Sequence, residues 1–184
     1  MPYSYPITGS KLYVTITAAE NTEIADINKT LSELDKQMEG KIYQLFDAGK
    51  ITEPNHIHYA AANAYYAMEN GSNISNRLDV ETLLYASTQN QISKAINLIG
   101  VSKKTRHIAI AVISDTQDDP AATLIAEYLG DLNDEILEPS PEKYETLKAL
   151  YDVTGTAIST VEGDKYKALT SLITEKGALI SLKR

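Results

Sequence analysis

The sequence predicts an α/β fold in which helices predominate and flank a small mixed β-sheet, all within one domain that spans residues 1–184. Three observations support this prediction. The chain has 184 residues, a length that suits one compact domain. Its 43% hydrophobic and 23% charged residues are typical of a globular protein with its own core. Short runs of β-branched and aromatic residues alternate along the chain with segments of helical periodicity.

The first half of the chain contains two predicted strands and two predicted helices. Residues 12–17 and 42–46 are rich in β-branched and aromatic residues, as strands are. Thr22 is the expected N-cap of the first helix, whose apolar residues recur at helical spacing until Gly40. The second helix covers residues 54–69, where alanines on one side predict close packing against a neighbouring element.

Residues 78–87 and 89–99 are predicted to form two further helices. In the second of these, four apolar side chains recur at helical spacing and should face the core: Ile92, Ala95, Ile96 and Ile99. Residues 105–113 follow as a strand that is apolar on both faces, which is typical of a central strand covered on two sides. We expect the helices at 55–69 and 89–99 to cover it.

Three more helices are predicted in the C-terminal part, at 118–132, at 141–151 and from about residue 164 towards residue 182. Acidic residues and a proline at the start of the first of these suit a helix N-terminus. Gly177 lies inside the last helix and should weaken it by about 1 kcal/mol relative to alanine. We therefore expect the end of this helix to be marginal on its own.

The residue types exclude several kinds of chemistry. The chain has no cysteine, which removes disulfides, thiolate metal sites and cysteine nucleophiles. It contains no glycine-rich phosphate loop and no hydrolase motif. His56 and His58 point about 200° apart on a helix and suit no shared metal ion. We expect His56 to be solvated and His58 to pack against the turn before Arg77, and we predict no metal and no cofactor.

Opposite charges are concentrated in different segments of this acidic chain, whose net charge is −8. Residues 108–145 hold ten acidic residues and one lysine, whereas residues 76–107 hold five basic residues and two acidic ones. If the helices at 78–87 and 89–99 pack antiparallel, the basic residues form a patch suited to phosphates. They are Arg77, Lys94, Lys103, Lys104 and Arg106. A loop that only increases solubility is the plain alternative.

Residues 73–101 carry a more specific pattern. It consists of Asn-Ile-Ser-Asn-Arg-Leu at 73–78, Glu-Thr-Leu-Leu-Tyr-Ala-Ser at 81–87, Gln-Ile-Ser-Lys-Ala-Ile at 91–96 and Gly-Val at 100–101. This pattern resembles the small accessory subunit of the KEOPS (EKC) complex, which is the PRPK-binding protein family. Matching order and spacing on either side extend the resemblance to about residues 41–182.

The resemblance implies a non-catalytic regulatory subunit. KEOPS carries out the transfer step that makes N6-threonylcarbamoyladenosine in tRNA. Its small subunit binds and activates the kinase-like ATPase of the PRPK family and helps recruit tRNA through the 3′ CCA end. The expected tRNA-binding residues are Arg77, Lys94, Lys103, Lys104, Arg106, His58, Asn76 and Gln91. Asn90 stands where the family usually has an arginine, so one cation that could contact phosphate is lost.

The C-terminal segment is the expected docking surface for the kinase-like subunit, because its apolar residues exceed one helical stripe. These residues are Leu172, Ile173, Leu179 and Leu182. They could instead cap the protein's own core. Two other functions stay open: a protein-only regulator of the kinase-like subunit without RNA contact, and an enzyme of unrelated chemistry.

The expected location is the cytoplasm. No apolar run approaches the roughly 18 residues that a membrane span needs. The first residues lack the basic start and the apolar stretch of a signal peptide. We therefore predict no membrane partner.

Overall fold

The computed structural model describes residues 1–182 and confirms the helix-rich α/β class, with 52% of the chain in helices and 15% in strands. Its sheet has the strand order β1-β2-β4-β3, and β5 pairs with the end of β2. The strands are β1 (Tyr3–Pro6), β2 (Tyr13–Glu20), β3 (Ile42–Asp47), β4 (Ile108–Ser114) and β5 (Asp131–Leu132).

Every strand pair described in this sheet is antiparallel, which corrects the prediction of a mixed sheet. The strands β2 and β3 do run in the same direction, as a strand-helix-strand unit predicts. However, β4 inserts between them and runs the opposite way. The start of β4 lies beside the end of β3, where Asp47 pairs with Ile108. The chain that connects the two strands therefore leaves and re-enters the sheet at the same end.

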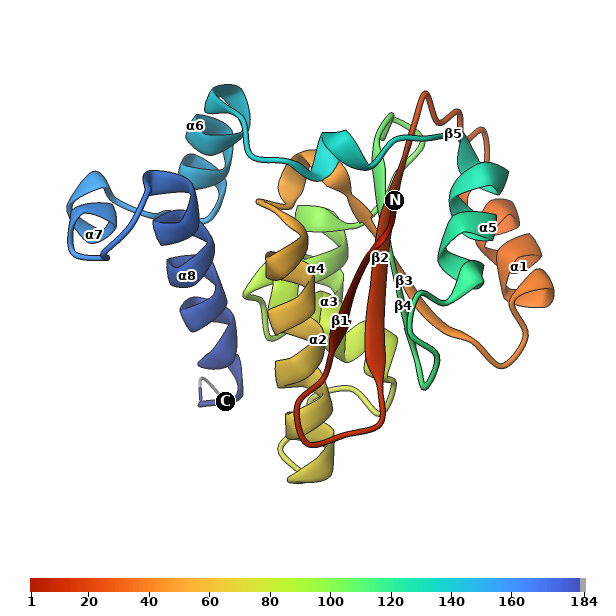
Figure 1. The fold of residues 1–184 in the computed structure, drawn as a ribbon, viewed down its shortest axis with the longest axis horizontal. Helices are drawn as coiled ribbons and strands as arrows, with labels where there is room; N and C mark the ends of the chain where they lie inside the picture. The colour runs from red at the N-terminus through yellow and green to blue at the C-terminus, as the bar shows by residue number, and fades with distance from the viewer. Residues whose placement is uncertain (183–184) are drawn as a thin grey trace.

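Helices cover both faces of the sheet (Figure 1). The helices α1 (Ile27–Gln37) and α5 (Pro120–Leu129) lie on one face. The helices α2 (Pro54–Glu69), α3 (Leu78–Ser87) and α4 (Ile92–Ile99) lie on the other. Beyond them lie α6 (Pro141–Leu150), α7 (Gly155–Ser159) and α8 (Lys165–Ala178). Three short 3-10 helices complete the described elements: η1 (Ala48–Lys50), η2 (Asp134–Leu137) and η3 (Ile180–Leu182).

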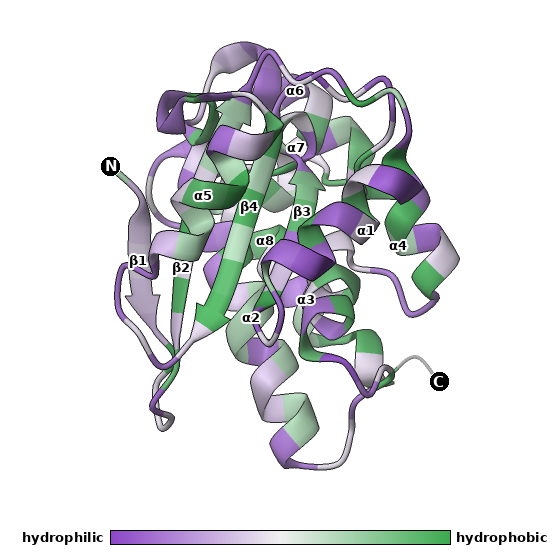
Figure 2. Ribbon diagram, turned by 90° about the vertical axis from the view of Figure 1, so that its right-hand side faces the viewer, coloured by the Kyte–Doolittle hydropathy of each residue, from purple (hydrophilic) through white to green (hydrophobic). Residues whose placement is uncertain are grey.

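The strand β4 is the centre of the core, which confirms the predicted central strand (Figure 2). Its side chains alternate between two hydrophobic clusters, as a pleated strand requires. Ile108, Ile110 and Val112 belong to the cluster that contains α1 and α5 residues. Ala109 and Ala111 belong to the cluster that contains α2, α3 and α8 residues. The two faces of this strand are therefore buried separately.

The prediction of which helices cover the central strand is partly wrong. The helix α2 does face the sheet, but its neighbour over the sheet is α3, which contacts β3. The helix α4 packs on α3 instead. The physical reason is that α3 is buried along most of its length, from Glu81 to Ser87, and fills the space next to α2.

The structure also corrects the predicted start of one helix and the predicted end of another. Thr22 does not cap a helix, because its side chain is buried and its hydroxyl donates a hydrogen bond to the carbonyl of Thr105 at 2.9 Å. Asp26 caps α1 in its place by accepting from the backbone N–H of Lys29. In the acidic segment, α5 ends at Leu129 and the chain then pairs with β2 as β5.

Gly177 has a packing role that the sequence does not reveal. It is buried where α8 crosses α3, and a Cβ at this position would lie 2.5 Å from the carbonyl oxygen of Tyr85. Glycine therefore allows the two helices to approach each other closely. The expected marginal helix end is instead a close contact between helices.

Candidate functional site

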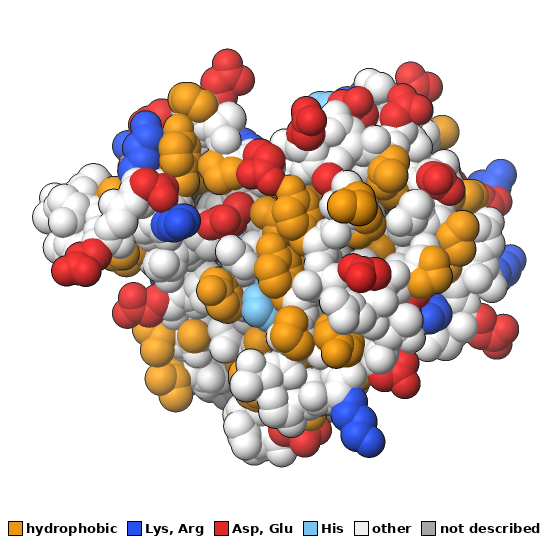
Figure 3. Space-filling view, in the orientation of Figure 1, with side chains coloured by type: hydrophobic (Ala, Val, Ile, Leu, Met, Phe, Trp, Pro, Cys, Tyr) orange, Lys and Arg blue, Asp and Glu red, His pale blue; other side chains and the backbone are white. Residues whose placement is uncertain are grey.

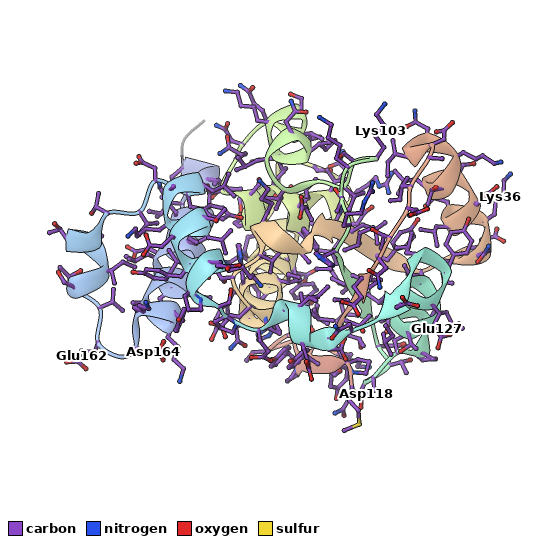
Figure 4. All side chains as sticks on the ribbon, turned by 90° about the horizontal axis from the view of Figure 1, so that it is seen from above. Lys36, Lys103, Asp118, Glu127, Glu162 and Asp164 are labelled. Carbon is purple, nitrogen blue, oxygen red and sulfur yellow. The ribbon has the colours of Figure 1, made fainter. Side chains whose placement is uncertain are left out.

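A groove of about 900 Å³ opens beside β3. Its floor is β3, and its walls come from α1 on one side and α3 and α4 on the other. Seen from above, Lys36 on α1 and Lys103 in the loop after α4 both lie in the upper right of the view (Figure 4). Apolar side chains that line the groove include Ile27, Leu31, Tyr43, Leu78, Ile92 and Ile96.

The floor of the groove is an open strand edge. The backbone N–H of Ala48 donates to the carbonyl of His107 at 2.9 Å, just beyond the paired strands. Because hydrogen-bonded positions alternate in an antiparallel pair, Gln44 and Phe46 bond to β4 while Tyr43 and Leu45 direct their backbone groups outwards. No strand among residues 1–182 pairs with that edge. The side-chain amide of Gln44 bonds the Leu45 carbonyl at 2.9 Å.

The α4 wall exposes two isoleucines that were expected to face the core. Ile92 is 42% exposed and Ile96 is 49% exposed, whereas Ala95 and Ile99 are buried. The expectation for Ile92 and Ile96 is therefore wrong. The helix packs on α3 rather than on the sheet, so only part of its apolar face reaches the core and the rest faces the groove. Two large apolar side chains left open in a groove indicate a binding surface.

One end of the groove carries an ion pair. The Arg77 side chain bonds both carboxylate oxygens of Asp79, with the Nε–Oδ1 distance at 3.2 Å. This hydrogen bond, together with the charge of Asp79, raises the pKa of Arg77 above its ordinary value. Nearby, the Tyr43 hydroxyl donates to Asp35 at 2.6 Å. Burial and this hydrogen bond raise the pKa of Tyr43. Arg77 therefore stays charged and Tyr43 stays protonated at neutral pH.

A buried carboxylate shapes the turn that presents Arg77. Glu81 is 0% exposed and accepts hydrogen bonds from the backbone N–H groups of Ile74, at 3.0 Å, and Ser75, at 2.7 Å. Buried carboxylates need such donors, because an unpaired one would be strongly destabilising. Sequence reasoning missed this residue. Its signal is a glutamate inside an apolar helix, four residues after Arg77.

The structure divides the predicted tRNA-binding residues into groups. Asn76 and Arg77 line the groove. Gln91 lies exposed at the N-cap of α4, and Lys94 is exposed on a different face of α4 from Ile92 and Ile96. Outside the groove, an exposed basic loop after α4 carries Lys103, Lys104 and Arg106. The Arg106 guanidinium is held by the carbonyls of Lys103, at 3.2 Å, and Thr22, at 3.4 Å.

His58 lies apart from these residues, and both histidine expectations are wrong. The His58 ring stacks on Tyr5, with the centroids 4.8 Å apart, and its Nε2 lies 3.1 Å from the Pro6 carbonyl. Burial lowers the pKa of His58. His56, expected in solvent, is 1% exposed. The reason is that β1, which the sequence did not predict, packs on His58, while the opposite side of α2, which carries His56, faces the core.

The predicted partner-binding residues differ in how far they are exposed to solvent. Leu179 is 43% exposed and Leu182 is 77% exposed. Leu172 is half-buried against the core. Ile173 is 0% exposed and belongs to the core itself, so it is not available to a partner. On the face drawn in Figure 3, further hydrophobic side chains gather around the histidine over α2 and β1.

The groove thus combines an open strand edge, apolar walls and, at one end, an arginine that is paired with an aspartate. The comparisons give the family. The model of the family described as kinase binding protein CGI-121 matches residues 18–181, and the chain belongs to this family, that of the PRPK-binding subunit of KEOPS/EKC. The resemblance predicted from the sequence is thus confirmed, and it reaches further towards the N-terminus than expected. The search of curated proteins found no significant match.

Two further findings concern the part of the chain that the structure describes. Within residues 1–182, no helix is both long and apolar enough to cross a membrane. Over the same residues, no three His, Asp or Glu side chains come together in a way that could hold a metal ion.

Proposed function

We propose that this chain is a non-catalytic regulatory subunit of a KEOPS complex, which acts in the N6-threonylcarbamoyladenosine modification of tRNA. It binds and activates the kinase-like ATPase subunit and helps recruit tRNA through the 3′ CCA end. The observation that carries this proposal is the family match across residues 18–181, since the family is described as kinase binding.

The groove supports the RNA part of the proposal. A single-stranded 3′ end has unstacked bases, which proteins bind between flat or apolar side chains. Ile92, Ile96 and Tyr43 offer such surfaces around one groove. Arg77 offers a planar fork that matches a phosphate. The basic loop after α4 lies outside the groove, where it would attract the acceptor stem rather than the terminal bases.

A protein-only regulator is the second candidate, and one observation favours it. Three acidic residues line the groove, Asp35, Glu69 and Asp79. Of the two cations there, Arg77 pairs with Asp79 and Lys41 pairs with the buried Asp119 at 2.7 Å. The groove therefore lacks the excess of positive charge that dominates most RNA-binding surfaces.

The RNA test compares a tRNA with its CCA end and the same tRNA without it. We expect the protein to lose at least tenfold in affinity when CCA is absent, because the bases in the groove are lost. Ile96→Glu should reduce binding of the complete tRNA to a similar degree. Leu124→Glu is the matched control, since Leu124 is 54% exposed on α5, outside the groove. Equal binding of the two tRNAs would contradict recruitment through the CCA end and leave the kinase-binding part of the proposal intact, whereas no binding of either tRNA would favour the protein-only regulator.

The kinase test uses co-elution with the kinase-like subunit of the same organism. Leu182→Arg should abolish co-elution without changing the melting temperature, because this side chain is exposed and docking surfaces depend on large apolar residues. Leu124→Arg should co-elute normally. If Leu182→Arg and Leu179→Arg both bind with unchanged affinity, the C-terminal segment is not the docking surface.

A further inference from the structure

We propose that Asp79 is a built-in competitor for the phosphate that Arg77 binds, and that it lowers the affinity of the groove for RNA. This inference rests on the proposed function. It adds a residue whose effect on binding is opposite to that proposed for Arg77, Ile92 and Ile96 in the same groove.

The geometry of the ion pair suggests competition. Arg77 uses its Nε and a terminal nitrogen to bond the two carboxylate oxygens of Asp79. A phosphate binds an arginine through the same pair of parallel hydrogen bonds. The Asp79 carboxylate therefore occupies the side of the guanidinium that a phosphate would use, and the ligand has to displace it.

The two partners are held to different degrees. Asp79 lies in the first turn of α3 and its side chain is only 15% exposed. The positive end of the helix dipole stabilises a carboxylate there, so Asp79 stays in place. Arg77 is the N-cap residue of α3, and its side chain is 72% exposed where it bonds Asp79. The long arginine side chain is the member of the pair that can move towards a ligand.

The expected size of the effect follows from the exposure of the pair. Exposed ion pairs are weak, so the competition costs affinity but does not close the groove; removing it should tighten binding about two- to fivefold. Loss of the carboxylate also removes a negative charge that repels the phosphate. If Asp79 instead positioned Arg77 for the ligand, its removal would weaken binding.

The experiment measures the affinity of Asp79→Asn for a single-stranded oligoribonucleotide that ends in CCA. We expect binding about two- to fivefold tighter than wild type. The gain should disappear in an Arg77→Ala background. Asp35→Asn is the matched control, because it removes a groove-lining charge that bonds Tyr43 and not Arg77. Unchanged or weaker binding by Asp79→Asn overturns the inference, as does an equal gain in Asp35→Asn.

A second measurement separates this inference from the proposed function. The Arg77 Nε–Hε signal is followed by NMR while inorganic phosphate is added to the wild type and to Asp79→Asn, both checked for an unchanged melting temperature. We expect the signal to move at about two- to fivefold lower phosphate concentration in the variant. If neither the wild type nor any variant binds RNA, the RNA part of the proposed function fails, and the phosphate titration still tests whether Asp79 competes with phosphate for Arg77. The same response in the wild type and in Asp79→Asn overturns the inference.

Discussion

At the scale of single residues, His56 shows how a polar side chain is satisfied inside the core. Its Nε2 lies 2.9 Å from the carbonyl of Ala86 and its Nδ1 accepts from the backbone N–H of Thr52 at 3.3 Å. These partners require a neutral ring that carries its proton on Nε2. Tyr151 packs edge-on against the ring, and its hydroxyl bonds the Lys50 carbonyl. One buried imidazole thus links α2, α3 and the C-terminal helices.

This environment predicts a pH dependence of stability. Burial lowers the pKa of His56 to about 4, whereas the ordinary value is 6.5. On acidification the unfolded chain takes up the proton first, so stability is present above pH 6.5 and is lost as the pH falls towards 4. The loss should be roughly 3 kcal/mol. Urea unfolding at a series of pH values measures it.

The control for this prediction is a pair of glutamine variants. His56→Gln should be less stable at pH 7 but should show a flatter pH profile between 6.5 and 4. His107→Gln, at an exposed histidine, should keep the wild-type slope. A wild-type slope in His56→Gln would assign the acid sensitivity to other groups.

At the scale of elements, the contact between α8 and α3 depends on one glycine. The Cβ of any other residue at position 177 would lie 2.5 Å from the Tyr85 carbonyl oxygen, which is a backbone atom and cannot rotate away. Ile173, one turn earlier on α8, is fully buried at the same interface with the core. The position of the exposed C-terminal leucines therefore follows from how closely α8 approaches α3.

Gly177→Ala should destabilise the protein even though alanine is the better helix former. Overpacking against the Tyr85 backbone should cost about 1–3 kcal/mol, which outweighs the gain of about 1 kcal/mol in helix propensity. Gly155→Ala is the matched control, because nothing lies within 4 Å of its Cβ position at the start of α7. Urea unfolding should place the control within about 0.5 kcal/mol of wild type. A more stable Gly177→Ala would show that the helices can separate.

The same contact illustrates what sequence patterns can and cannot predict. Periodicity located α2, α3, α4 and the central strand, because those signals are local. It could not tell which part of the α4 stripe faces the core, since that depends on α4 packing on α3. For the same reason the sequence alone predicts that Ile92 and Ile96 face the core, and it indicates only the low helix propensity of Gly177 and not its contact with the Tyr85 backbone. The role of Glu81 was missed because its partners lie in a turn without a pattern of its own.

At the scale of the whole molecule, the sheet combines a protected centre with an open edge. The strand β4 is paired on both sides, with β2 and β3, and its residues 108–113 are at most 3% exposed. The strand β3 is paired on one side only, and its free side is the floor of the groove. The walls of α1 and α4 recess this edge, which limits pairing with other chains while leaving room for a ligand.

This arrangement predicts a pattern of hydrogen exchange across the sheet. Amides of residues 108–113 should exchange slowest, because they open only when the whole core does. Within β3, the Gln44 amide bonds to β4 and should be protected, whereas the Tyr43 amide faces the groove and should exchange much faster. Residue-resolved exchange measured by NMR checks both statements. An oligoribonucleotide bound on the groove floor should slow exchange at Tyr43 and leave residues 108–113 unchanged. Equal protection of Tyr43 and Gln44 in the free protein would mean that the edge is covered, and the groove would then lack the floor on which the proposed RNA site depends.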